Sequence, residues 1–359
     1  MITEKQVLFA LSHVQEPDLK KDLVALNMIK DIKIEGNHIQ FTIVLTTPAC
    51  PLKDKMKDDS IAAIHAHVAA DAKIQVDFTA NVSTNRSDKF VLPGVRNIIA
   101  IMSGKGGVGK STVASNLAIA LAQTGAKVGL LDADIYGPSQ AVMFGLEGQQ
   151  PFMEDVNGKS FIVPLESHGV KLISIAFLLR PDQAVAWRGP MVSSALKQFV
   201  SEVSWGELDY LILDMPPGTG DIHLTLLQTV PLTGVVMVTT PQQVALADAQ
   251  KGALLLGMMP SKIPMLGVVE NMAWFTPAEL PNNRYPIFGK GAGEQLAKQF
   301  GAPLLAQIPL YMEIMEGADT GKPAALQQNT PYGEIYTQLA QAVAQQIAIK
   351  NADGIAASN

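Results

Sequence analysis

The chain has 359 residues, of which 48% are hydrophobic and 17% are charged, and its formal net charge at pH 7 is −6. This length and composition are typical of a folded protein with two domains or one large one, and they exclude a disordered chain. The acidic balance argues against a general nucleic-acid binder, and no apolar run approaches the roughly 20 residues that a membrane-spanning helix needs. The amino-terminal stretch is unlike a signal peptide, and the single cysteine, Cys50, allows no internal disulfide. We therefore expect a soluble, cytoplasmic protein that binds neither nucleic acid nor membranes.

The first 80 residues have the pattern of a small α+β domain. Its expected elements are an amphipathic helix, two strands around a Gly-Asn turn, a second helix and a third strand, at residues 4–13, 28–36, 38–47, 57–70 and 72–80. Residues 81–96 are polar and rich in turn-forming residues without any period, so we expect a linker there.

From Asn97 onward the apolar runs lose their polar alternation. Runs rich in Ile, Val and Leu now alternate with helical stretches, and they occupy residues 97–103, 126–134, 208–217, 233–241 and 263–271. Strands of this kind are covered on both faces, which predicts a mostly parallel sheet with crossover helices. We expect this domain to span residues 97–350. The tail, residues 351–359, has no core-forming pattern and is expected to be flexible.

The stretch SGKGGVGKST, residues 103–112, contains the phosphate-loop pattern G-x-x-x-x-G-K-S/T between a predicted strand and a predicted helix. Glycines in such a loop let backbone N–H groups surround phosphates, reinforced by the positive end of the following helix. Lys110 is expected to reach the β- and γ-phosphates, and the Ser111 hydroxyl to bind Mg²⁺. The predicted fold class is therefore an α/β P-loop NTPase, with a mostly parallel sheet flanked by helices and preceded by the small α+β domain. The residues of this loop expected to contact the nucleotide are Gly104, Gly106, Gly107, Val108, Gly109, Lys110, Ser111 and Thr112.

Three carboxylates follow predicted strands, at the sheet edge where open α/β sheets bind ligands. Asp132 and Asp134 end one apolar run, and Asp214 ends another. Mg²⁺ is usually held by one or two carboxylates together with phosphates and waters, and hydrolysis also needs a group that orients the attacking water. These acids can cover both roles, although any one of them can instead cap the next loop or helix.

A second lysine, Lys105, follows the first glycine of the loop, where the phosphate-loop pattern requires none. Because Lys110 already serves the bound nucleotide, Lys105 is better placed to reach phosphate on a facing subunit. A cation supplied in this way stabilises transition-state charge as an arginine finger does. The stretch GKGGVGKST resembles the deviant Walker A motif of P-loop ATPases that dimerise around nucleotide. That group includes the nitrogenase iron protein, the arsenite-pump ATPase and the Min and Par positioning ATPases.

Further stretches narrow the resemblance. LLDADIYGPS, WRGPM (Trp187–Met191), DMPPGTGD, VTTPQQVALAD and GVVENMAWF together resemble the Mrp/ApbC family of iron–sulfur cluster carrier ATPases. The amino-terminal domain, with TTPACPLKDKM at residues 46–56, is similar to the small iron–sulfur assembly domain often fused to these ATPases. The resemblance covers nearly the whole chain and implies a homodimer that hydrolyses ATP with Mg²⁺. Its expected cargo is an iron–sulfur cluster of the 4Fe–4S type, and its expected partners are apoproteins or assembly scaffold proteins.

The resemblance also implies roles for single residues. Lys105 is the signature lysine that acts across the dimer, and Asp134 orients the attacking water. Asp132 and Asp214 lie near the metal. Asn271, at the end of the run VVEN, matches the position that contacts the adenine edge, and the alternative is an asparagine that ends a strand in a turn.

The chain departs from the family after the ENM segment. Many members have a Cys-x-x-Cys there, where a cluster is thought to bridge the dimer, but this chain has ENMAWFTPAELPNNRYPIFGKG without a cysteine. Clusters usually take about four thiolates, whereas a homodimer of this chain offers only its two copies of Cys50. Cys50 lies at the expected start of a helix, close to Lys53 and Lys55, which favours a reactive surface thiolate that can bind iron. The alternative is a buried structural cysteine.

Two other functions remain open at this point. A Min/Par-type positioning or adaptor ATPase would switch with nucleotide and hold no cluster. Its membrane-bound forms need a basic amphipathic tail and its DNA-bound forms need a basic surface, but the stretch YGEIYTQLAQAVAQQIAIK has almost no basic residues. An electron donor like the nitrogenase iron protein needs cysteines that this ATPase domain lacks. We therefore expect the cluster carrier.

Overall fold

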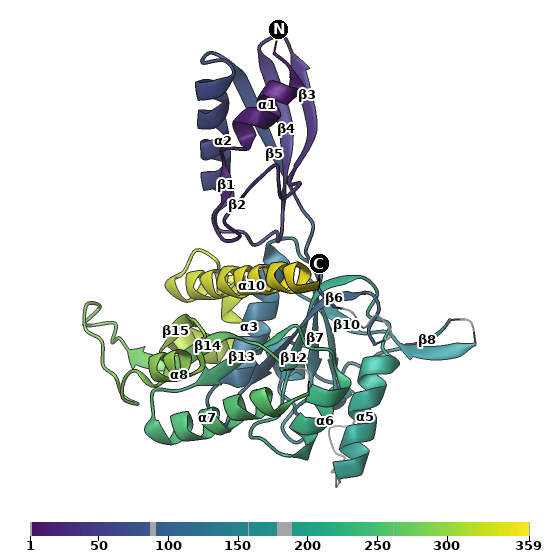
Figure 1. The fold of residues 1–359 in the computed structure, drawn as a ribbon. Coiled ribbons are helices and arrows are strands. Elements are labelled where there is room, and N and C mark those ends of the chain that lie inside the picture. The colour runs from purple at the N-terminus through teal and green to yellow at the C-terminus, as the bar shows by residue number, and fades with distance from the viewer. Residues whose placement is uncertain (1, 87–90, 157, 178–188, 261, 359) are drawn as a thin grey trace. The chain divides into compact units, whose positions relative to one another are not determined.

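The structure, a computed structural model, describes residues 2–86, 91–156, 158–177, 189–260 and 262–358 (Figure 1). Contacts between Cα atoms divide the chain into two compact units. Unit 1 comprises Met1–Asn85 together with Ala344–Asn359, and unit 2 comprises Arg86–Val343.

Unit 1 contains a three-stranded sheet. β3 (Ile29–Glu35) and β4 (His38–Leu45) form an antiparallel hairpin around Gly36, whose φ of 62° is readily adopted only without a Cβ. α2 (Lys53–His67) then crosses over to β5 (Lys73–Ala80), which pairs parallel to β4. All the strands expected in the first 80 residues are present.

α1 (Glu4–Leu11) and the segment that follows it pack against this sheet. α1 begins with a capping box, in which the Thr3 side chain accepts the Gln6 N–H and the Gln6 side chain accepts the Thr3 N–H. Two very short strands that the sequence did not predict, β1 (Gln15–Glu16) and β2 (Lys21–Asp22), pair with each other. The core is built from fully buried side chains, among them Val7, Leu11, Leu23, Ile39, Phe41, Ile43 and Ile64.

Unit 2 contains an eight-stranded sheet with the order β10-β11-β7-β12-β6-β13-β14-β15. Neighbouring strands are parallel throughout, except for β10 against β11. The strands are β6 (Val95–Met102), β7 (Val128–Asp132), β10 (Leu165–Ser167), β11 (Val170–Ser174), β12 (Leu208–Asp214), β13 (Gly234–Thr239), β14 (Met265–Phe275) and β15 (Leu304–Leu310). A separate antiparallel hairpin joins β8 (Met153–Val156) and β9 (Lys159–Ile162). The predicted α/β fold with a mostly parallel sheet is confirmed.

Helices cover both faces of this sheet (Figure 1). The helices that begin in unit 2 are α3 (Lys110–Gln123), α4 (Gln140–Met143), α5 (Gly189–Ser201), α6 (Asp221–Thr229), α7 (Gln243–Met258), α8 (Ala292–Phe300), α9 (Met312–Asp319) and α10 (Pro331–Ser358), and the 3₁₀ turns are η1 (Ile175–Phe177) and η2 (Ala324–Leu326). Ile98 and Ala100 of β6 belong to an apolar cluster with α5 to α8, while the buried residues of α3 lie outside that cluster. Because side chains alternate across a strand, the fully buried Ile99 and Ile101 face the other side. Within the described ranges, no helix combines the length and apolarity that crossing a membrane requires.

The strand register brings the carboxyl ends of the central strands to one edge. Asp214, the last residue of β12, pairs with Asp132, the last residue of β7, on one side and with Ile101 of β6 on the other. The chain leaves β6 after Met102 and enters the phosphate loop. The loop and both of these carboxylates therefore start from the same edge, where open α/β sheets bind ligands.

Residues 351–358, where we expected a flexible tail up to residue 359, are helical. α10 continues to Ser358. Asn351 is 3% exposed, and its Nδ2 donates to the Ser83 carbonyl oxygen over 2.8 Å. The alanines of this segment favour a helix, and Asn351 has a buried partner that is distant in the sequence.

Candidate functional site

Glycine shapes the backbone of the phosphate loop, which joins β6 to α3. Gly107 and Gly109 both have a φ of 81°, a left-handed conformation that other residues rarely adopt. α3 begins at Lys110, directly after Gly109, without a side-chain cap. Because no side chain occupies the N–H groups of this first turn, they and the positive end of the helix dipole suit a phosphate.

Neighbouring elements lie close to two glycines of the loop. A Cβ on Gly104 would lie 2.1 Å from the backbone carbonyl carbon of Asp248 in α7, and a Cβ on Gly109 would lie 2.1 Å from Asn271 Nδ2. The same Nδ2 donates to the Val108 carbonyl oxygen over 2.8 Å. The loop is therefore held in place by α7 and β14, and a larger residue at either glycine would displace it.

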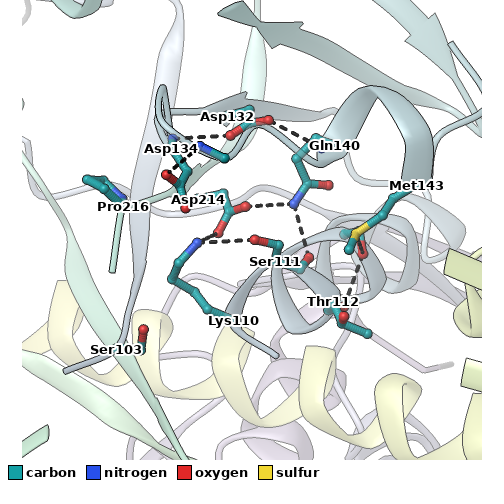
Figure 2. A network of polar contacts seen from close by, with 12 residues as sticks. Ser103, Lys110, Ser111, Thr112, Asp132, Asp134, Gln140, Met143, Asp214 and Pro216 are labelled. Carbon is teal, nitrogen blue, oxygen red and sulfur yellow. Dashed lines mark hydrogen bonds and ion pairs between the residues drawn. The ribbon is translucent and has the colours of Figure 1, made fainter. Parts of the chain in front are cut away.

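A buried ion pair lies at the centre of the site (Figure 2). Lys110 Nζ pairs with Asp214 Oδ1 and also donates to Ser111 Oγ over 3.2 Å. The Lys110 and Asp214 side chains are 6% and 0% exposed. The second carboxylate oxygen, Asp214 Oδ2, accepts from Gln140 Nε2 over 2.8 Å. These donors compensate a carboxylate that has lost its hydration.

Asp132 is fully buried at the same edge. Its Oδ1 accepts the Asp134 N–H over 3.1 Å, and its Oδ2 accepts the Gln140 N–H over 3.2 Å and the Ser174 hydroxyl over 3.0 Å. Burial above all, and then the charge of Asp214, raise the pKa of Asp132 to about 7. Two carboxylates that repel each other in this way would be stabilised by a cation between them.

Asp134 is half-buried, and it is the least buried of the three predicted carboxylates. Its Oδ1 accepts the Gly137 N–H over 3.3 Å. Burial raises the pKa of Asp134, while the nearby Lys110 lowers it by less. The charge of Asp134 therefore interacts with the charges of Lys110 and Asp214.

The donors gathered here suit Mg²⁺. They are hard oxygens, namely the Ser111 hydroxyl and the carboxylates of Asp132 and Asp214. No group of three or more His, Cys, Asp or Glu side chains in the described part of the chain is arranged to hold a metal ion by itself. Mg²⁺ takes much of its coordination from phosphates and water, so it fits a site with few protein ligands.

The two lysines of the loop have opposite environments. Lys110 is buried against Asp214, whereas Lys105 is exposed. Lys105 lines a pocket of about 210 Å³ together with loop backbone, Thr240 and Met272. An exposed lysine can reach a second molecule without giving up a buried partner.

Asn271 lies inside a strand. β14 continues to Phe275, so the alternative that Asn271 ends a strand in a turn is wrong. The strand is irregular there, because Met272 has a φ of 57° and the register with β15 shifts between Asn271 and Phe275. The contact of Asn271 with an adenine edge stays a prediction.

Aromatic and backbone contacts close the loop that follows β14. Phe275 and Tyr285 exchange two backbone hydrogen bonds of 2.8 Å. The Arg284 guanidinium lies 4.3 Å from the centre of the Trp274 ring, a cation–π contact. The WRGPM stretch (Trp187–Met191) begins outside the described residues.

Cys50 is buried, so the prediction of a reactive surface thiolate is wrong. It is 8% exposed and belongs to the apolar core of unit 1. Burial raises the pKa of the Cys50 thiol, and the Leu52 N–H and Lys53 lower it by less. The prediction failed because the nearby helix start and lysines matter less than the loss of hydration.

In the folded protein, Cys50 should react with iodoacetamide at pH 7 on the order of 100-fold more slowly than in the urea-unfolded chain, because a buried thiol forms little accessible thiolate. A quenched time course read by mass spectrometry would measure both rates, and Cys50→Ala would give the background. Equal rates would show that the thiol is accessible, and Cys50 would again be a candidate iron ligand.

Two buried residues of the site, Gln140 and Ser174, were not predicted from the sequence. Gln140 begins a short helix, and Ser174 ends β11 in register with Asp132. A serine at the end of a strand is a usable signal, but β11 itself was not predicted. Nothing in the sequence around Gln140 marked it as buried.

Comparisons with known proteins agree with this geometry. A family model described as NUBPL iron-transfer P-loop NTPase matches residues 94–344, and one described as iron–sulfur cluster assembly protein matches residues 4–77. The iron–sulfur cluster carrier protein of Synechocystis sp. is 49% identical over 330 residues, which cover 91% of this chain and 93% of that protein. The protein of the same name from Escherichia coli K12 is 42% identical over 340 residues, with coverage of 94% and 90%. Among solved structures, a nucleotide-binding protein of Archaeoglobus fulgidus in complex with ADP is 35% identical with a TM-score of 0.55, and the match covers 67% of this chain and 91% of that one.

Proposed function

The chain belongs to the NUBPL family of iron-transfer P-loop NTPases, and from this premise we propose that it is an ATP-hydrolysing carrier that binds iron–sulfur clusters and transfers them to apoproteins in the cytoplasm. In this proposal residues 97–350 hydrolyse ATP and residues 1–80 take part in handling the cluster, with 81–96 as the linker. The observation that supports it best is the presence, in one chain, of a phosphate-loop site and of a region that matches a cluster-assembly model.

Nucleotide binding follows from the phosphate loop and its buried lysine. The loop backbone, with Thr112 beside the α-phosphate, surrounds the phosphates, and Lys110 reaches the β- and γ-phosphates. Ser111 and Asp214 would hold Mg²⁺, with Asp132 close by, and the bound metal would neutralise charge on the phosphates. Since Lys110 is paired with Asp214 in this structure, it must leave that carboxylate to reach a phosphate.

Hydrolysis requires an oriented water and an additional cation. Asp134 is half-buried next to the Lys110 and Asp214 charges, a suitable position for a group that holds the attacking water. Lys105 is exposed, and we assign it to the phosphate of a second copy of this chain. The proposed active species is therefore a homodimer that forms around ATP, and Asn271 is proposed to contact the adenine.

The cluster is cargo in this proposal, and the chain alone does not provide its ligands. Cys50 is the only thiol, and it is buried with a raised pKa. Iron–sulfur clusters are held by thiolates, usually about four. We therefore derive no ligand role for Cys50, and thiols from outside the chain, such as those of a scaffold or client protein, must complete the coordination.

The protein, purified without oxygen and incubated with iron, sulfide and a small thiol that can supply the missing ligands, should retain both iron and sulfide, and it should then activate an apo iron–sulfur enzyme. Iron and acid-labile sulfide analysis measures retention, and recovered enzyme activity measures transfer. The same mixture without the protein is the control. Normal ATP hydrolysis with neither retention nor transfer would contradict the carrier and favour the alternative, a Min/Par-type nucleotide-switched adaptor without a cluster.

A further inference from the structure

Gln140 connects the elements that form the metal-binding part of the site (Figure 2). It is the first residue of α4 and is fully buried. Its backbone N–H donates to Asp132 Oδ2 over 3.2 Å. Its side-chain Nε2 donates to Asp214 Oδ2 over 2.8 Å and to the Ser111 carbonyl oxygen over 3.0 Å. One side chain therefore contacts both the end of β12 and the start of α3.

These contacts fix the orientation of the Gln140 amide. Both partners of Nε2 are acceptors, so a turned amide would place Oε1 against two other oxygens. Gln140 Oε1 is buried and has no hydrogen-bond partner in the described part of the chain. An unpaired buried oxygen is unfavourable, and an apolar side chain of the same size would avoid it. The two N–H bonds to Asp214 and Ser111 therefore account for a glutamine at this position.

The bond to Asp214 matters most when Lys110 moves. In this structure Asp214 Oδ1 pairs with Lys110, and Oδ2 accepts from Gln140. Once Lys110 turns to a nucleotide phosphate, the fully buried Asp214 loses its ion pair, which is strongly disfavoured unless other partners remain. The Gln140 amide does not need to move, so it keeps Oδ2 bonded and leaves Oδ1 available to a cation.

We infer that Gln140 is a positioning residue for Mg²⁺-dependent nucleotide binding: it holds the Asp214 carboxylate and the start of α3 in the arrangement that the metal needs. Residues that orient metal ligands typically change metal affinity by about 10- to 100-fold when they are replaced. This inference rests on the proposed ATP-binding function.

Gln140→Met keeps the size of the side chain and removes both of its donors. The Mg²⁺ concentration that gives half-maximal binding of a fluorescent ATP analogue should rise by about 10- to 100-fold. Binding of the analogue in EDTA should stay close to that of the wild type, whereas the thermal unfolding midpoint should fall, because the buried Asp214 carboxylate and the Ser111 carbonyl oxygen each lose a donor. A residue with only a structural role would instead weaken binding equally with and without Mg²⁺.

Two further variants make this test decisive. Gln140→Asn keeps an amide that is too short to reach both partners, so it should show the same shift. Gln149→Met is the same substitution at an exposed position and should leave the Mg²⁺ dependence unchanged. The inference is overturned if both Gln140 variants keep the wild-type Mg²⁺ dependence, if they weaken binding equally with and without Mg²⁺, or if neither folds. A wild-type protein that binds no nucleotide would instead contradict the proposed function.

Discussion

Replacing Lys105 by alanine should slow ATP hydrolysis by about 10³-fold or more, a loss typical of removing an arginine finger, while nucleotide binding stays close to that of the wild type. The Lys105 side chain is exposed, so its removal disturbs no buried pair. Its proposed role is to place positive charge on the phosphate bound by a facing subunit. Phosphate release measures the rate of ATP hydrolysis, and titration calorimetry with ATP measures nucleotide binding. A wild-type rate of hydrolysis in Lys105→Ala would show that the proposed role is wrong.

Lys110→Ala provides the contrast, because it should lose nucleotide binding itself. Without this lysine the backbone of the loop leaves the charge of the β- and γ-phosphates poorly neutralised. The fully buried Asp214 also loses its ion pair, and breaking such a pair typically destabilises a fold by about 3–5 kcal/mol. Urea unfolding without nucleotide should therefore show a loss of stability in Lys110→Ala and none in Lys105→Ala.

The fold was predictable where strands are buried on both faces. Uninterrupted apolar runs in the sequence predicted five strands that lie inside the sheet, namely β6, β7, β12, β13 and β14. β15 was missed because it lies at the sheet edge, where most of its residues are only partly buried and Gln307 and Pro309 interrupt the run. β11 was missed for a similar reason, since Lys171 interrupts a five-residue strand. Edge and short strands have too weak an apolar pattern to be seen in a single sequence.

The site was predictable where a local motif carries the chemistry. The glycines, Lys110 and Ser111 follow one another in the sequence, and Asp132 and Asp214 end apolar runs. The position of Gln140, by contrast, depends on how β7, β12 and α3 meet, which no local pattern records. Cys50 shows the same limit, because its neighbours in sequence favoured a thiolate whereas the packing of unit 1 buries it.

Asp134→Asn should bind MgATP normally but hydrolyse it at least about 100-fold more slowly, the usual effect of losing a group that activates the nucleophile. An asparagine has the same shape and can still accept the Gly137 N–H, so the loop should keep its conformation. It has no negative charge with which to orient the attacking water. The variant should therefore accumulate as an ATP-bound dimer, which light scattering with and without ATP would detect. A monomer under both conditions would count against dimerisation driven by nucleotide.

Mixing this variant with Lys105→Ala would test the two roles together. In a mixed dimer, the site on the Lys105→Ala subunit retains its own Asp134 and faces the intact Lys105 of the other subunit. If Lys105 acts across the interface, an equal mixture of the two inactive proteins should recover roughly a quarter of the wild-type rate, because half of the dimers are mixed and each has one working site. If Lys105 acts on the nucleotide of its own subunit, both sites of the mixed dimer lack one essential group and the mixture stays inactive. Recovery therefore requires that Lys105 and Asp134 serve the same phosphate from different chains.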